Sequence, residues 1–233
     1  MTSRAQPAQH APPVQWLRVR YAKRGRARFT SHRDFSRALE RALRRAGVPM
    51  AYSSGFSPHP RISYANAAPT GAASEAEYLE IGLAEACDPA KVRAALDAAL
   101  PPGLDIVDVA PSSIGSLADR LTGSRWRIEL VGLPPDHTRV AVDRFLAATS
   151  VPVERMTRTG LREFDARSAV VSLSAQPDAL DLVLAHQVPL VRPDDVLVAL
   201  TTVTPEFVPP AAPVLTRLSQ GRLDPASGEI AEP

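Results

Sequence analysis

Apolar and polar positions along the first fifty residues change their period once. Residues 16–22 (WLRVRYA) mix large β-prone side chains with charged ones, which is typical of a strand. From Ser31 the period becomes helical, and Gly47 followed by Pro49 ends it, while Ser31 and Asp34 have the spacing of a capping box. The apolar positions share one helical face: Phe35, Ala38, Leu39, Ala42, Leu43 and Ala46. The pattern predicts a strand followed by an amphipathic helix.

The rest of the first half continues with short apolar runs. We expect strands at residues 48–53, 62–67, 76–84 and 103–111, and a helix over 88–100 that begins with Asp88 as cap and Pro89 in its first turn. The predicted order is β-α-β-β-α-β, the ferredoxin-like unit.

A similar order begins again further along the chain. We expect helices over 135–150, with Val140, Phe145 and Leu146 inward, and over 191–200; the expected strands are residues 124–133, 151–159, 164–176 and 179–187. The predicted fold class is α+β with two tandem ferredoxin-like (βαββαβ) units. The predicted division is a disordered leader (1–14), a basic unit (15–111), a connector (112–123), a second unit (124–205) and a proline-rich tail (206–233).

Composition narrows the class of protein. The chain has 233 residues, 45% of them hydrophobic, which is enough for one large core or two small ones. No apolar run is long enough to span a membrane and no secretory signal is present, so we expect a cytoplasmic protein without a membrane partner. Cys87 is the only cysteine, which excludes disulfides, cysteine-ligated zinc and an iron–sulfur cluster held by this chain. We expect no cofactor and no metal, and Cys87 to be a small packing residue.

Charge is distributed very unevenly along the chain. Residues 1–67 hold thirteen Lys and Arg against Asp34 and Glu40, a net charge of +11, and the remainder carries −9. Four arginines lie on the helical face opposite the apolar one: Arg33, Arg37, Arg41 and Arg44. Together with the basic residues 18–28 they predict a surface that follows phosphates, with RNA as the partner. The alternatives are a merely solvated face and an acidic protein partner.

The segment GFSPHPRISYA (55–65) follows this helix. Pro58 and Pro60 restrict their own φ angles and hold the preceding residues extended, so that His59 is presented by a stiff turn. Phe56 and Tyr64 have flat faces that suit an unpaired base, and Arg61 adds a cation. The alternative is that both aromatic residues anchor the core.

Two histidines are the only candidates for catalysis. His32 and His59 could share one site and cleave a phosphodiester by general acid–base catalysis, or hold a metal through imidazole, although the nearby Asp34 is used by the helix cap. No P-loop, dinucleotide-binding or nucleophile-elbow motif is present. The catalytic residues stay unknown, and we do not predict an enzyme.

Residues 21–83 carry a family resemblance through SHRD, RALRRAG, GFSPHPRISYA and EYLEI, and later stretches at FDARS (164–168) and RPDDVL (192–197) agree with it. The chain resembles the uncharacterised radical-SAM-linked protein family, in the stand-alone form without the radical-SAM domain. The resemblance implies no known activity, but it implies a radical-SAM enzyme or a ribonuclease as a partner. Three hypotheses follow. The first is an RNA-binding accessory protein in tRNA or rRNA processing or modification, the second an adaptor that docks onto a radical-SAM enzyme, and the third a metal-independent endoribonuclease using His32 and His59.

Overall fold

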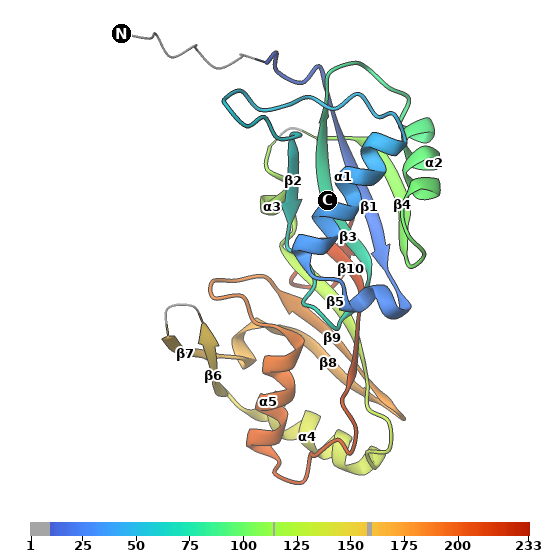
Figure 1. Cartoon of the computed structure of the whole chain (residues 1–233). Helices are drawn as coiled ribbons and strands as arrows, with labels where there is room; N and C mark the ends of the chain where they lie inside the picture. The colour runs from blue at the N-terminus through green and yellow to red at the C-terminus, as the bar shows by residue number, and fades with distance from the viewer. Residues whose placement is uncertain (1–9, 114, 158–159) are drawn as a thin grey trace. The chain divides into compact units, whose positions relative to one another are not determined.

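The computed structural model describes residues 10–113, 115–157 and 160–233 (Figure 1). This part of the chain is a mixed α+β structure with a large mixed sheet and five α-helices. It forms two compact units. Unit 1 consists of the described residues up to Gly71 and of Glu75–Leu117, and unit 2 of Ala72–Ser74 and Ala118–Pro233. Most of the expected leader, residues 1–9, lies outside the described residues, as do Arg158 and Thr159 of an expected strand.

Unit 1 contains a four-stranded sheet in the order β4-β1-β3-β2. Strand β1 pairs antiparallel with β4, and β2 pairs antiparallel with β3. In chain order the elements are β1 (Gln15–Lys23), a 3-10 turn (Gly25–Phe29), α1 (His32–Arg45), β2 (Ile62–Ala65), β3 (Ala73–Leu83), α2 (Pro89–Ala99) and β4 (Leu104–Pro111). Each of these strands and α-helices matches an expected element to within a few residues.

One expected strand of unit 1 is wrong. Residues 48–53 form only two isolated bridges, Met50 with Leu83 and Tyr52 with Pro60. The physical reason is Pro49, because a proline has no backbone N–H to donate to a ladder.

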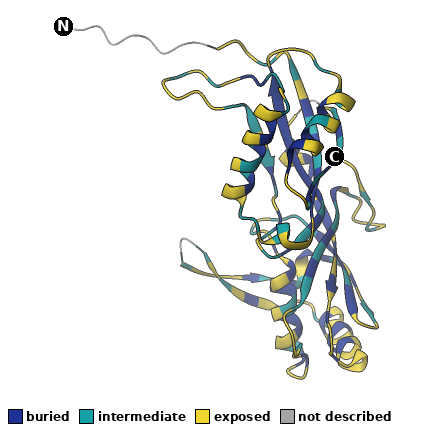
Figure 2. Cartoon of the chain, turned by 45° about the vertical axis from the view of Figure 1, so that its right-hand side comes forward, coloured by how far each residue is buried: buried dark blue, intermediate teal, exposed yellow. Residues whose placement is uncertain are grey.

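The core of unit 1 lies between the sheet and its two helices. Alternate residues of β1 and β3 enter it, and α1 contributes one apolar stripe (Figure 2). The largest members are Leu17, Val19 and Tyr21 from β1, Phe35, Leu39 and Leu43 from α1, and Leu79, Ile81 and Leu83 from β3. The residues of α1 that are buried therefore follow the helical period of 3.6 residues, as the sequence predicts, and the residues that β1 and β3 contribute to this core follow the strand period of two.

Unit 2 has the strand order β10-β5-β9-β8, with Ala73–Ser74 parallel to β10 and β11 antiparallel to it. A separate hairpin pairs β6 with β7. The elements are α3 (Leu117–Arg120), β5 (Gly123–Glu129), α4 (Pro135–Ala147), β6 (Pro152–Thr157), β7 (Gly160–Asp165), β8 (Val170–Gln176), β9 (Ala179–Ala185), α5 (Pro193–Val203), β10 (Val214–Leu223) and β11 (Ile230–Ala231). Helix α3 begins at Leu117, the last residue of unit 1, and continues into unit 2.

Three features of unit 2 differ from the sequence expectations. Residues 206–233, expected as a tail, contain β10, which pairs along its length with β5. The expected strand 164–176 is interrupted by a 3-10 turn at Arg167–Ala169. In α4 the buried side chains are Thr138, Ala141, Val142 and Phe145, whereas Val140 and Leu146 are partly exposed. Strand β10 was missed because it follows several prolines and buries Arg217 and Gln220 rather than an apolar series.

A chain of hydrogen bonds joins three side chains inside unit 2. The indole Nε1–H of Trp126 donates to Ser124 Oγ at 2.9 Å, and Ser124 Oγ lies 2.9 Å from His186 Nε2. His186 Nδ1 lies 2.6 Å from the Leu121 carbonyl oxygen and donates to it in the neutral tautomer that fits both contacts. Burial lowers the pKa of His186, and the charge of Arg217 lowers it further, against the opposing hydrogen bond to Leu121.

We therefore expect unit 2 to lose stability on mild acidification. Because the folded-state pKa lies below the ordinary value of about 6.5, the unfolded chain binds the proton first, and the free energy of unfolding falls as the pH drops from that value through the folded-state pKa. The slope from one proton is at most about 1.4 kcal/mol per pH unit. Urea unfolding between neutral and mildly acidic pH checks this, with His186→Gln flattening the dependence. The matched control His137→Gln, at an exposed position, should leave it unchanged.

Candidate nucleic-acid interface

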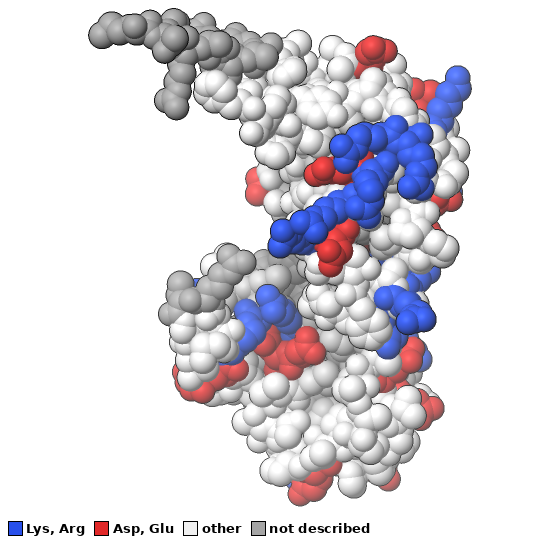
Figure 3. Space-filling model, viewed as in Figure 1, with Lys and Arg blue, Asp and Glu red and all other residues white. Residues whose placement is uncertain are grey.

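Four arginines form an exposed stripe on the outer side of α1. Ser31 caps this helix, since its hydroxyl oxygen accepts from the backbone N–H of Asp34 at 3.2 Å. The helix then turns its apolar stripe to the sheet and leaves the opposite side in solvent. We call the four exposed residues of that side, Arg33, Arg37, Arg41 and Arg44, the arginine face. In Figure 3 a band of basic side chains crosses the region that α1 occupies in Figure 1.

The arginine face is not neutralised by its surroundings. Within the residues that the structure describes, no side chain of these four makes a hydrogen bond or an ion pair. Arg45, the next residue, differs because its Nη1 donates to the Ala99 carbonyl oxygen at 3.0 Å and thereby ties α1 to α2. The like charges of the face repel each other by a few tenths of a kcal/mol per pair. In the described part of the chain, four unpaired positive charges therefore lie along one side of α1.

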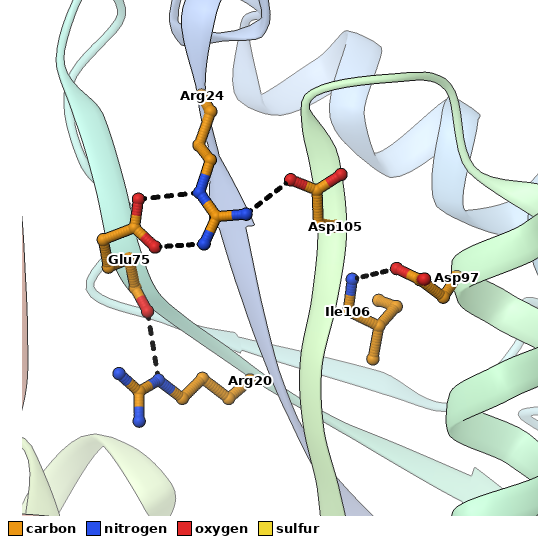
Figure 4. A network of polar contacts seen from close by, with 6 residues as sticks. All are labelled: Arg20, Arg24, Glu75, Asp97, Asp105 and Ile106. Carbon is orange, nitrogen blue, oxygen red and sulfur yellow. Dashed lines mark hydrogen bonds and ion pairs between the residues drawn. The ribbon is translucent and has the colours of Figure 1, made fainter.

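Three basic residues of β1 and the turn after it, Arg18, Arg20 and Arg24, contact acceptors within unit 1. Arg24 donates to both carboxylate oxygens of Glu75 and, at 2.8 Å, to Asp105 (Figure 4). The hydrogen bond to Glu75 is the main cause that raises the pKa of Arg24 above its ordinary value. Arg20 donates to the Glu75 carbonyl oxygen at 3.0 Å, and Arg18 lies 3.9 Å from Asp108. These cations connect β1, β3 and β4, so Arg18, Arg20 and Arg24 are engaged within unit 1, whereas Arg26 of the same stretch is exposed.

The segment between α1 and β2 is held as a defined loop. Ser53 N–H donates to the His59 carbonyl oxygen at 2.9 Å, and His59 N–H donates to Ser53 Oγ at 3.0 Å. Arg61 N–H donates to the Ala51 carbonyl oxygen at 2.8 Å, and its Nε reaches the Tyr52 carbonyl oxygen at 3.3 Å. One donor of the Arg61 guanidinium is therefore engaged by the loop backbone. We call residues 51–61 the proline loop.

The proline loop and the second half of α1 enclose a cavity of about 260 Å³, which we call the α1–loop cavity. From α1 come Glu40 and Arg44, and from the loop come Tyr52 and His59. Arg44, the last residue of the arginine face, and His59, the histidine between two prolines, therefore line the same cavity. The sequence could not show this, because nothing in its pattern defines the path of the proline loop. Glu40 and Tyr52 are site residues that the sequence analysis did not single out.

The two aromatic residues flanking His59 have different environments. The Phe56 side chain is 77% exposed, so it is no core anchor. Tyr64 is half-buried: its ring lies edge-on to His32 at 4.7 Å and to Phe35 at 6.2 Å between centroids. Burial raises the pKa of the Tyr64 phenol and the charge of Glu40 raises it further, against a hydrogen bond with Ser36. Only Phe56 offers a free ring face.

The two histidines occupy different ends of α1. His32 is the first residue of the helix and contacts Tyr64, whereas His59 lies beside Glu40, Leu43 and Arg44. At 1.5 Å per residue, the step from His32 to Leu43 is about 16 Å along the axis. A single site in which both act on one phosphodiester is not supported by this placement. Among the described residues no three side chains of His, Cys, Asp or Glu are arranged to hold a metal ion.

The comparisons with known proteins define the family. Residues 16–193 match the family model DUF2344, described as uncharacterised proteins conserved in bacteria. Because the match extends over more than half of the chain, the chain belongs to this family. No curated protein sequence matches it. In the described part of the chain, none of the helices combines the length and the apolar character that crossing a membrane requires.

Proposed function

We propose that this protein binds single-stranded RNA through the arginine face and acts as an accessory protein in tRNA or rRNA processing or modification. The observation that carries the proposal is the contrast within unit 1. Carboxylates and carbonyl oxygens engage Arg18, Arg20 and Arg24, whereas the arginine face has no such partner among the described residues. A row of guanidinium groups along one helix suits the phosphates of a nucleic-acid backbone, which Arg contacts with two parallel hydrogen bonds.

The proline loop supports a single-stranded rather than a double-stranded partner. Phe56 presents an exposed ring in the loop whose residues His59 and Pro60 line the α1–loop cavity together with Arg44. Unpaired bases stack on such rings, whereas the bases of a duplex are already stacked on one another. Phosphate contacts on α1 followed by base contacts at the loop would form one continuous surface.

We further propose that each unit is ferredoxin-like. Unit 1 connects its elements as βαββαβ with the strand order β4-β1-β3-β2. Unit 2 has the corresponding order β10-β5-β9-β8, with the β6–β7 hairpin inserted after α4. Several RNA-binding modules use four-stranded sheets of this kind, but a fold alone does not specify a function, so the RNA proposal rests on the arginine face.

Salt dependence tests the proposal directly. If four or five arginines each engage a phosphate, the logarithm of the association constant for single-stranded RNA should fall with the logarithm of salt concentration with a slope of about −3, from about −0.7 per phosphate. Fluorescence anisotropy of a labelled oligonucleotide between roughly 50 and 200 mM salt measures this slope. A slope near zero, or no binding, would contradict the proposal.

The adaptor hypothesis predicts a different result. Docking onto a radical-SAM enzyme through other surfaces would give a stable protein complex that survives charge reversal on α1. Co-purification of such an enzyme with both the native chain and an α1 charge-reversed variant, without RNA binding by either, would favour the adaptor.

A further inference from the structure

The α1–loop cavity has a composition that the arginine face alone does not explain. Part of its wall is apolar, with Leu43 and Met50 from the core side and the rings of Pro58 and Pro60 from the loop, and the rest is polar. Its volume of about 260 Å³ lies just below the range of roughly 300–1,000 Å³ found for sites of drug-sized ligands. A cavity of this volume suits one ring system rather than a longer segment of chain.

Two charged groups of opposite sign belong to the polar part of the wall. Among the described residues that line the cavity, Glu40 is the only carboxylate and Arg44 the only guanidinium. They are four residues apart on α1, so both project from one side of the helix. Glu40 is partly buried, and neither side chain forms an ion pair with the other or with a third residue among those described. The cavity therefore combines an acceptor-only group with an adjacent cation.

The cavity is held open by the backbone of the proline loop. The bridge between Tyr52 and Pro60 and the two hydrogen bonds between Ser53 and His59 close the loop on itself. Prolines at 58 and 60 remove further conformational freedom at the rim. Little conformational entropy of this wall would therefore be lost when a ligand binds.

We propose that the α1–loop cavity binds a single unstacked guanine base of the RNA, with the Glu40 carboxylate accepting hydrogen bonds from the N1–H and the 2-amino group. The inference rests on the proposed function. The flanking phosphate meets Arg44 and the preceding phosphates meet Arg41 and Arg37, which continue along the arginine face.

Guanine is the base whose Watson–Crick edge fits a carboxylate. It presents two adjacent N–H donors, and an ionised carboxylate has two acceptor oxygens and no donor. Adenine and cytosine each present one amino group beside an unprotonated ring nitrogen, which would face a carboxylate oxygen with its lone pair. Uracil presents one N–H between two carbonyl oxygens. Each of these bases leaves an acceptor opposed to an acceptor in a partly buried site, which is costly.

Oligonucleotides that differ at one base test the inference. We expect RNA with a single guanosine in an oligouridine context to bind roughly ten-fold more tightly than all-uridine RNA, within the range that a two-bond base contact supports. Inosine, which lacks the 2-amino group, should fall between the two. Glu40→Gln should remove the preference for guanosine while keeping the salt dependence, and the matched control Glu85→Gln, at an exposed position of unit 1, should keep both.

The outcomes separate this inference from the proposed function. Salt-dependent binding with equal affinity for guanosine, inosine and uridine would overturn the guanine site and leave the arginine face as a binding surface. A guanosine preference that persists in Glu40→Gln would also overturn it, since another group would then read the base. Absence of any RNA binding would overturn both.

Discussion

Replacing Arg37 and Arg41 by glutamate is expected to lower the affinity for single-stranded RNA about 100-fold. Each substitution removes a charge-assisted hydrogen bond to a phosphate, which is worth about 1.5 kcal/mol or more. Two such losses amount to about 3 kcal/mol, and 1.4 kcal/mol is a factor of ten in affinity. The new carboxylates also repel the phosphate backbone, so the estimate is a lower bound.

The same variant should change the salt dependence in a defined way. With Arg33 and Arg44 retained, the slope of log affinity against log salt should become shallower by about 1.4, from about −0.7 for each lost phosphate contact. Anisotropy titrations at several salt concentrations measure affinity and slope together. Far-UV circular dichroism should show an unchanged helix content, because both residues are exposed and do not contact the core.

A control variant with the same change in net charge distinguishes RNA binding at the arginine face from attraction by the overall charge of the protein. Arg139 and Arg144 lie on α4 of unit 2, are exposed, and pair with Asp136 and Glu206. Arg139→Glu/Arg144→Glu should therefore leave the affinity within a small factor of the native value. Equal losses in the two variants would show that net charge, and not the arginine face, attracts the RNA.

The elements that the sequence predicts correctly are those whose signals lie close together along the chain, as in helix α1. The cap, the apolar period and the stop predict helix α1, and all three lie between Ser31 and Pro49. The capping bond at Ser31 and the burial of Phe35, Leu39 and Leu43 confirm that prediction. The exposure of the arginines follows from the same period, because the side of a helix opposite a buried stripe faces solvent.

Interactions between distant residues explain what the sequence could not predict. The charge count over residues 1–67 contains no sign that Glu75, Asp105 and Asp108 neutralise basic residues of β1 and its turn. Those carboxylates belong to β3 and β4, and only strand pairing brings them next to β1. Strand β10 was missed for a related reason: its pairing with β5 joins residues far apart in sequence, and its own pattern is too polar to indicate burial.

The composition of the candidate site was partly predictable. Arg44, Phe56 and His59 were selected by charge, aromatic character and the stiffness of the proline segment. Their arrangement depends on how residues 51–61 return to α1 through the contacts of Ser53, Tyr52 and Arg61. These are side-chain and backbone contacts without a repeating pattern, which is why Glu40 and Tyr52 went unrecognised.

Two phenylalanine substitutions, identical in chemistry, should separate stability from binding. Phe35 is 3% exposed and stacks on Tyr21 with 4.3 Å between ring centroids, in the core on which α1 rests. Phe35→Ala leaves a cavity there and should lower the free energy of unfolding of unit 1 by about 3–5 kcal/mol. Phe56→Ala removes the same atoms from an exposed position and should change it by no more than about 0.5 kcal/mol.

Urea unfolding followed by far-UV circular dichroism and by tryptophan fluorescence measures both effects. Trp16 lies in unit 1 and Trp126 in unit 2, so Trp16→Phe backgrounds show which part of the fluorescence change belongs to unit 2. Under the RNA proposal Phe56→Ala should in addition weaken RNA binding by at least about five-fold, since stacking of one base on an aromatic ring is worth about 1–3 kcal/mol. If Phe56→Ala instead cost several kcal/mol of stability, its ring would be packed in solution and could not serve as a platform for a base.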